Sequence, residues 1–148
     1  MTDITIDYMM RYTWQNIAKM YNDEASKYGA TMSIGFALLS IDKEEGTPSS
    51  AISSRMGMEP TSLTRTLKTL EDKGLIIRKK NPEDGRGVII QLTELGKEKR
   101  ELSKQTVLKF NENVKSNIND EDLKLFFKVA TKINQLIQDK NIFNQTVL

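Results

Sequence analysis

The side chains best suited to chemistry lie in one stretch, Glu59 to Gly74, where hydroxyls and cations share one face of an expected helix. Leu63, Leu67 and Leu70 recur at spacings of four and three, which predicts a helix with a buried apolar stripe. The polar residues fall on the opposite face: Thr61, Ser62, Thr64, Arg65, Lys68 and Thr69. These side chains offer hydrogen bonds and positive charge and include no carboxylate.

Two interpretations of this polar face stay open from the helix alone. Hydroxyls and cations suit a nucleic-acid groove, where phosphates and base edges accept hydrogen bonds. An ordinary solvated face has a similar composition. The acidic residues Glu71 and Asp72 lie only in the last turn, where the helix dipole disfavours them, and this placement favours a face kept clear of negative charge at its other end.

Composition excludes several classes of site. The 148-residue sequence has no cysteine and no histidine, which removes the commonest metal ligands and the commonest general base. No group of carboxylates, lysines or serines forms a recognisable catalytic pattern, so we predict that the protein is not an enzyme and needs no cofactor or metal. No apolar run approaches bilayer length and no signal pattern opens the chain, so we expect a cytoplasmic protein with no membrane partner.

The net charge of +2 is unevenly distributed along the chain. Residues 1–47 carry 4 cations and 7 anions, residues 48–92 carry 8 and 5, and residues 93–148 carry 10 and 8. The middle third is therefore the positive one, and it contains the helix described above. The excess is modest and would not by itself identify a DNA-binding protein.

A second short helix is expected just before the polar one. Thr47 and Pro48 resemble a cap and a first-position proline, and the helix is expected to run to Met56. Gly57 supplies the break. Two short helices joined by a glycine-containing turn predict a helix-turn-helix.

A β-hairpin is expected after the helix-turn-helix. Residues 75–80 and 88–92 are β-rich, and the segment 81–87 between them is dense in turn residues. In this position the hairpin becomes the wing of a winged helix. Arg86 lies between two glycines at the tip, from which it could extend into a minor groove. A solvated surface arginine is the alternative that the glycines also permit.

The two ends of the chain are expected to be helical and apolar. Residues 4–28 carry a broad apolar face that predicts burial against the C-terminal helices or against a partner chain. A helix from Thr31 or Ser33 to about Asp42 follows. A long helix capped by Thr93 and a last helix opening at Asn119 or Asp120 complete the pattern. Shared between two copies, the apolar ends would form a homodimer core.

The predicted fold is mainly α with a small β-hairpin wing (α+β), a winged helix-turn-helix joined to a helical dimerisation domain. Residues 1–30 are expected to form an N-terminal dimerisation helix and residues 31–92 the winged helix-turn-helix. Residues 93–148 are expected to supply a long connecting helix and a C-terminal dimerisation helix.

Four short motifs follow one another through the centre of the chain: Leu63-Thr64-Arg65, Gly74-Leu75-Ile76 with Arg78, Asp84 with Arg86, and Leu92-Thr93 with Gly96. In order and spacing they resemble the MarR family of bacterial transcription regulators. The resemblance implies a homodimer whose two winged helices bind a palindromic operator in double-stranded DNA. It further implies a repressor that a small-molecule effector releases. Ser53 stands where the family usually has alanine.

The resemblance also assigns expected roles to individual residues. The polar helix would contact DNA through the six residues of its exposed face, and Arg86 would enter the minor groove. Asp84 would orient that wing arginine. Arg78 would support the wing at its base and is also expected to contact DNA. Ser49 and Ser50 would meet phosphate at the start of their helix.

An effector pocket is the last expectation, and its lining is expected to be adaptable methionines beside aromatic rings: Met9, Met10, Tyr12, Trp14, Met32 and Phe36. Ordinary core packing is the alternative for each of these residues. For the whole protein, the alternative function is a winged-helix module that binds protein and not DNA, whose affinity would not fall steeply with salt.

Overall fold

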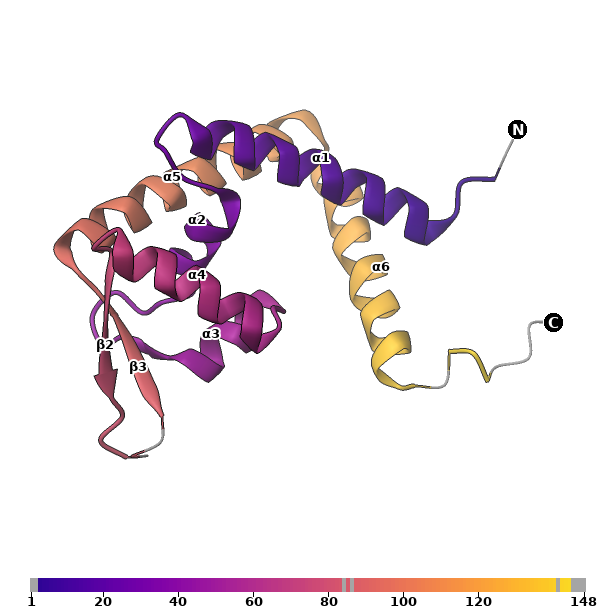
Figure 1. The fold of residues 1–148 in the computed structure, drawn as a ribbon. Helices are drawn as coiled ribbons and strands as arrows, with labels where there is room; N and C mark the ends of the chain where they lie inside the picture. The colour runs from indigo at the N-terminus through magenta and orange to yellow at the C-terminus, as the bar shows by residue number, and fades with distance from the viewer. Residues whose placement is uncertain (1–2, 84, 86, 141, 145–148) are drawn as a thin grey trace. The chain divides into compact units, whose positions relative to one another are not determined.

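The computed structural model describes residues 3–83, 85, 87–140 and 142–144 (Figure 1). The chain divides into two compact units, Met1–Gln105 and Thr106–Leu148. The described residues form these elements: α1 (Ile6–Ser26), α2 (Met32–Leu39), β1 (Thr47–Pro48), α3 (Ser49–Met56), α4 (Pro60–Asp72), β2 (Ile76–Lys80), β3 (Val88–Leu92), α5 (Glu94–Asn117) and α6 (Asp120–Gln138). Over these ranges, no helix combines the length and the apolar character that crossing a membrane requires.

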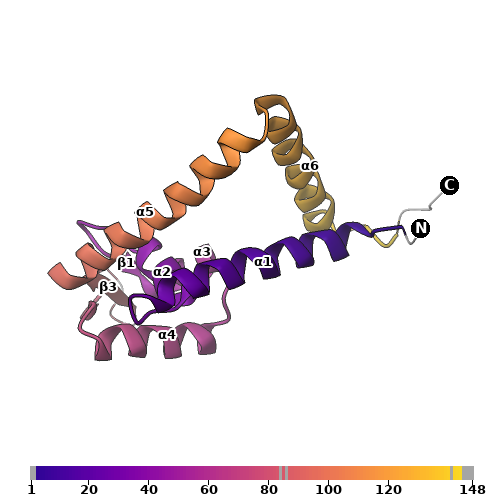
Figure 2. The same cartoon turned by 90° about the horizontal axis from the view of Figure 1, so that it is seen from above.

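The core of the first unit lies between α2, α3, α4 and the sheet. Its fully buried large side chains are Leu38, Ile41, Ile52, Leu70, Ile76 and Ile90. The predicted stripe of α4 is confirmed, since Leu63, Leu67 and Leu70 are 4%, 3% and 0% exposed. Burying such side chains contributes roughly 1.5–3 kcal/mol each. This face anchors α4 and leaves its opposite face outward, and Figure 2 shows α4 at the edge of the unit with α2 and α3 on its inner side.

The predicted hairpin is confirmed, and the sheet has one strand more than the sequence indicated. β2 and β3 pair antiparallel with Arg78 opposite Ile90, and β1 pairs with the other edge of β3, giving the order β1-β3-β2. The β2–β3 hairpin extends beyond the helices (Figure 1). The expectation that Thr47 caps a helix is wrong. Thr47 is buried in β1, and its hydroxyl oxygen accepts a hydrogen bond from the Asp42 N–H at 2.7 Å.

The turn between α3 and α4 is closed by a side chain. Gly57 adopts the left-handed conformation that ends α3, with φ of 59°. The Ser53 hydroxyl then donates to the Met58 carbonyl at 2.7 Å. Ser53, the position that departs from the family pattern, therefore fixes the turn that sets the angle of α4.

Ser53→Ala should destabilise the protein by roughly 1 kcal/mol, because the half-buried Met58 carbonyl loses its donor. Urea unfolding followed by circular dichroism measures this difference. The matched control is Ser54→Ala, one residue along on the exposed side of α3, which should change stability by less than about 0.5 kcal/mol. Equal effects of the two substitutions would contradict the role of Ser53.

The wing joins α5 through a compact junction at Thr93. The Thr93 hydroxyl donates to the Gly74 carbonyl at 2.6 Å and accepts from the Gly96 N–H at 3.0 Å, as predicted for a helix cap. The Thr93 N–H donates to the Leu75 carbonyl at 3.0 Å. Gly96 is buried so tightly that an added Cβ would lie 2.0 Å from the Leu75 carbonyl oxygen. The motif Leu92-Thr93-x-x-Gly96 is thus a packing requirement.

Gly96→Ala should destabilise the protein by roughly 1–3 kcal/mol, because the backbone at Leu75 must move to admit a methyl group. The shift appears in the midpoint of chemical unfolding. Gly85→Ala serves as the control, since a Cβ there meets no atom within 4 Å among the residues described. If both alanine variants unfold at the same denaturant concentration, the junction is not the tight contact described.

Two arginines hold the end of α2 in place. Arg55 of α3 donates to the Ser40 carbonyl at 2.9 Å, and Arg100 of α5 donates to the Ile41 carbonyl at 3.1 Å. The next carboxyl, on Asp42, accepts backbone N–H bonds from Glu45 and Glu44 at 2.7 and 2.9 Å. Those bonds lower the pKa of Asp42, and the positive charges of Arg100 and Arg55 lower it further. This turn brings the chain back to β1.

Asp42→Ala should lower the melting temperature at neutral pH and have less effect in acid. Because the folded pKa of Asp42 lies below its unfolded value of about 3.9, its stabilisation is present above that pH and is lost as the pH falls through the folded pKa. Thermal unfolding of parent and variant from pH 7 to pH 2.5 measures the difference. A difference in melting temperature that is the same at both ends of this range would contradict the assignment.

The terminal helices expose large apolar side chains. Tyr21 is the one buried residue of α1, whereas Trp14, on the apolar face predicted for residues 4–28, is 51% exposed. In the second unit α6 begins at the cap Asn119, as predicted, and contains no buried residue among those described. Phe126 and Phe127 of α6 are 54% and 58% exposed and contact each other edge to face. These faces are far more apolar than a solvated helix requires.

Candidate nucleic-acid interface

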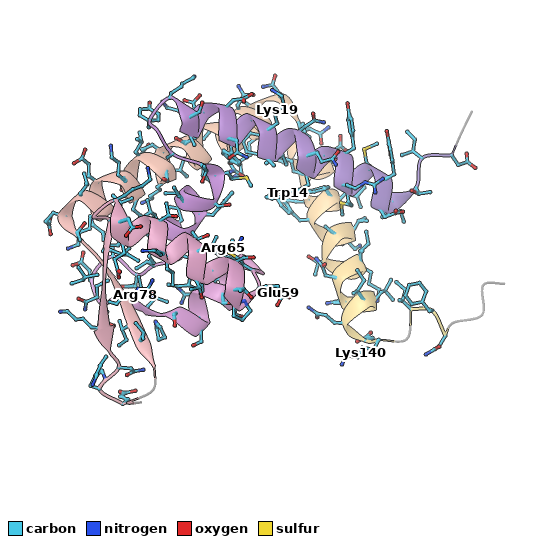
Figure 3. The ribbon with its side chains drawn as sticks, in the orientation of Figure 1. Trp14, Lys19, Glu59, Arg65, Arg78 and Lys140 are labelled. Atoms are coloured by element: carbon cyan, nitrogen blue, oxygen red, sulfur yellow. The ribbon has the colours of Figure 1, made fainter. Side chains whose placement is uncertain are left out.

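The polar face of α4 is fully presented to solvent. All six residues predicted for it are exposed: Thr61, Ser62, Thr64, Arg65, Lys68 and Thr69. At about 100° per residue, the other five lie within about 100° of Arg65 around the helix axis. Arg65 is therefore the centre of the face, and Figure 3 shows it midway along α4. Among the described residues its guanidinium forms no ion pair or hydrogen bond, so its donors are available to a ligand.

Two of the three threonine hydroxyls on this face, those of Thr64 and Thr69, are not free donors. Thr64 Oγ1 donates to the Pro60 carbonyl at 2.9 Å, and Thr69 Oγ1 donates to the Arg65 carbonyl at 3.1 Å. Each hydroxyl proton is thus used within the helix, and the oxygen retains only acceptor capacity toward an external group. The sequence indicated a face of donors. The donors it offers outward belong to Thr61, Ser62, Arg65 and Lys68.

The two acids in the last turn of α4 have partners of their own. Glu71 Oε2 accepts from Arg78 Nε of β2 at 2.8 Å, which ties α4 to the base of the wing. Asp72 lies 3.5 Å from Lys68 Nζ, but both side chains are more than 60% exposed, so this pair contributes little stability. Lys73 Nζ also donates to the Gly29 carbonyl after α1 at 3.2 Å. Of the two acids, Glu71 therefore positions the wing against α4, and Asp72 does not.

The edge strand of the wing adds two cations that were not predicted to contact DNA from the sequence. Lys79 and Lys80 follow Arg78 on β2, and all three are exposed (Figure 3 labels Arg78). β2 is an edge strand, and after the buried Ile76 its residues are exposed on both faces and show no alternation. The run of three consecutive basic residues at the start of the predicted wing is the sequence feature that could have identified Lys79 and Lys80 as candidate phosphate contacts.

The remaining residues predicted to contact DNA or to orient the wing lie on α3 and at the wing tip. Ser49 and Ser50 open α3, half-buried and exposed respectively. Asp84 and Arg86, predicted for the wing tip, lie outside the described residues. The loop that carries them is closed at its base, where the Asn81 N–H donates to the Gly87 carbonyl at 3.0 Å.

The predicted effector-pocket residues fall into two groups. Met9, Met10, Tyr12 and Trp14 lie exposed on the N-terminal half of α1. Met32 and Phe36 are half-buried on α2, where Phe36 packs edge to face on Tyr21 with ring centroids 5.6 Å apart. Trp14 precedes Tyr21 by about two turns, roughly 10 Å along the axis. Phe36 and Met32 thus contact the C-terminal half of α1, where the Met32 N–H donates to Asn22 Oδ1 at 3.0 Å, whereas the other four residues lie along the N-terminal half.

Sequence comparison matches residues 31–88 to the MarR family. The chain is 30% identical over 90 residues to the uncharacterized HTH-type transcriptional regulator YdgJ of Bacillus subtilis, covering 61% of this chain and 55% of that protein. It is 31% identical over 99 residues to the HTH-type transcriptional regulator SarZ of Staphylococcus aureus, covering 66% of this chain and 67% of SarZ. The chain thus spans little more than half the length of the first of these relatives.

Two solved structures share the fold. The S. aureus MepR–DNA complex superposes with a TM-score of 0.82 at 20% identity, covering 90% of this chain and 98% of MepR. PcaV of Streptomyces coelicolor, solved with its natural ligand, gives 0.76 at 17% identity, covering 91% of this chain and 98% of PcaV. The winged helix-turn-helix, its junction motif and these matches together show that the chain belongs to the MarR family.

Proposed function

We propose that the protein is a transcriptional regulator that binds a specific sequence of double-stranded DNA, and the observation that carries this is the exposed face of α4. That face is held outward by a buried leucine stripe and centres on Arg65, which pairs with none of the described residues. An α-helix fits the major groove, and arginine is the side chain that most often recognises a base there, through guanine O6 and N7. Lys68 and the hydroxyls of Thr61 and Ser62 are proposed to contact phosphates, and Thr64 and Thr69 to contact neighbouring bases.

The wing is the second proposed contact. Arg86 is proposed to enter the minor groove, with Asp84 orienting it, while Lys79 and Lys80 meet the backbone phosphates. Arg78 acts from the base of the wing through its ion pair with Glu71. Ser49 and Ser50 are proposed to contact phosphate at the start of α3. Because α4 and β2 are joined by this ion pair, a shift of the recognition helix would displace the wing with it.

A homodimer is the proposed active form. α1 and α6 expose Trp14, Phe126, Phe127 and Ile137, each about half accessible in a single chain. A second copy would cover these side chains and gain the free energy of apolar burial, at roughly 25 cal/mol per Å². Two-fold symmetry would then present two copies of α4 to a palindromic operator, whose half-sites lie one helical turn or a multiple apart.

Repression and release complete the proposal. A protein bound to an operator that overlaps a promoter excludes RNA polymerase from that promoter. Repression of this kind requires no surface on the protein for contacting the polymerase. A small aromatic or amphipathic effector is proposed to bind beside the methionines and aromatic rings of α1 and α2: Met9, Met10, Tyr12, Trp14, Met32 and Phe36. Methionine and aromatic side chains adapt to such ligands. The ligand-bound structure of PcaV, which has the same fold, supports the presence of such a site.

Selection from a random duplex pool at physiological salt tests the DNA-binding proposal directly. We expect recovered fragments to contain an inverted repeat, and affinity to fall roughly a thousandfold between 50 and 200 mM salt if six or more phosphates are contacted. A variant with Lys79 and Lys80 both changed to glutamine should show a shallower salt dependence. Recovery of no enriched sequence, together with affinity for a protein that salt hardly changes, would favour the protein-binding alternative.

A further inference from the structure

We propose that Thr64 and Thr69 select A·T base pairs by their methyl groups and acceptor oxygens, on either side of the base that Arg65 reads. This inference rests on the proposed function and specifies the kind of operator the protein takes. Its basis is the direction of two side-chain hydrogen bonds within α4.

The direction of these bonds is unambiguous. A carbonyl oxygen carries no proton, so Thr64 Oγ1 must be the donor to the Pro60 carbonyl, and Thr69 Oγ1 must be the donor to the Arg65 carbonyl. Each oxygen lies against the preceding turn of the helix. The outward surface of each side chain is therefore a methyl group with an accepting oxygen beside it.

The two threonines flank Arg65 on the exposed face. At about 100° per residue, Thr64 lies about 100° to one side of Arg65 and Thr69 about 40° to the other. Thr69 is also one turn further along, roughly 6 Å, which is close to the length of two base-pair steps. Side chains so placed meet different base pairs from the one that Arg65 contacts.

The chemistry of base edges then favours A·T pairs at the threonine positions. In the major groove an A·T pair displays the thymine methyl and the adenine N6 amine, which match a methyl group and an accepting oxygen. A G·C pair offers an amine on cytosine but no methyl. Purine N7 atoms need a donor, and these threonines have already used theirs. Guanine is left to Arg65, whose donors no described residue uses.

Modified DNA tests this without altering the protein. In the operator recovered by selection, each thymine is replaced in turn by uracil, which removes only the methyl group. We expect about a fourfold weaker binding at each thymine that a threonine contacts. Replacing adenine by 7-deazaadenine at the paired positions removes only the N7 acceptor and should leave affinity unchanged. 7-Deazaguanine at the Arg65 position should weaken binding at least tenfold.

A pair of matched variants assigns the effect to one residue. Thr69→Ser keeps the hydroxyl and removes the methyl group, so the uracil penalty at its base pair should disappear. Thr69→Val keeps the methyl group and should retain that penalty. Thr69 is exposed, so neither substitution disturbs the core. Circular dichroism of the two variants checks that α4 is intact.

The outcomes separate this inference from the proposed function. If no duplex is enriched, the proposed function fails. If an operator is bound but no uracil substitution matters, or if 7-deazaadenine weakens binding at the same positions, the threonines act as donors or make no contact and this inference is overturned. A uracil penalty that survives in Thr69→Ser and also in Thr64→Ser overturns the assignment to these residues.

Discussion

Arg65→Ala is expected to weaken operator binding by roughly 1–3 kcal/mol for each half-site and to relax the sequence preference at one base pair. Arg65 lies at the centre of the exposed face of α4, and no described residue competes for its guanidinium. The bidentate contact of Arg65 with a guanine would be lost, because alanine has no side-chain donor to replace the guanidinium. Titration of the selected operator and of every single-base variant of it measures both the affinity and the discrimination.

Lys68→Ala is the matched control on the same face. Lys68 carries the same charge on a flexible chain, already near Asp72, so its loss should weaken binding to all sequences alike. The slope of log affinity against log salt should fall by about one for each phosphate contact removed. Should Arg65→Ala discriminate among single-base variants as well as the parent does, the assignment of Arg65 to a base edge is wrong.

Phe126→Asp is expected to convert the proposed dimer to monomers. Phe126 lies near the middle of the apolar arc of α6 and is 54% exposed in a single chain, so the fold of one chain depends little on it. In a dimer the same ring would be covered, and a buried aspartate there would cost roughly 2–4 kcal/mol or more. Sedimentation equilibrium measures the mass, and operator titration the accompanying loss of affinity.

The control for this prediction introduces the same side chain elsewhere on the helix. Lys128→Asp lies on the lysine-bearing side of α6, about 160° from Phe126 by helical geometry. It should leave the dimer intact. A parent protein that sediments as a monomer at micromolar concentration would contradict the proposed dimer, and so would a Phe126→Asp variant that remains dimeric.

The sequence predicted most where local pattern and burial agree. The spacing of Leu63, Leu67 and Leu70 sets both the helix and its buried side, and the structure places all three in the core. The sequence also predicted the Thr93 cap and narrowed two others to Thr31 or Ser33 and to Asn119 or Asp120, because an N-cap bond involves residues only three apart; the structure has Thr31, Thr93 and Asn119. Family resemblance added the order of the motifs, and the comparisons confirm the family.

What could not be read from the sequence depends on contacts distant along the chain. Thr47 has the composition of a cap, but its pairing with Ile90 makes it part of a strand. Glu71 has the appearance of an acid placed away from a ligand, but its partner Arg78 lies beyond the next turn. The hydroxyl bonds of Thr64 and Thr69 are local, but whether a helical threonine makes such a bond depends on its side-chain rotamer, which the sequence does not specify.

The arrangement of the sheet has a consequence for solubility at high concentration. An edge strand carries unpaired backbone groups that can pair with another molecule and seed aggregation. Here one edge is the two-residue β1, which ends in Pro48, and the other is β2, with Arg78, Lys79 and Lys80 exposed along it. Charge repulsion and proline both oppose strand addition. The lysines proposed to contact phosphates therefore also act as gatekeepers against fibril growth, so neutralising them would weaken the resistance to aggregation together with DNA binding.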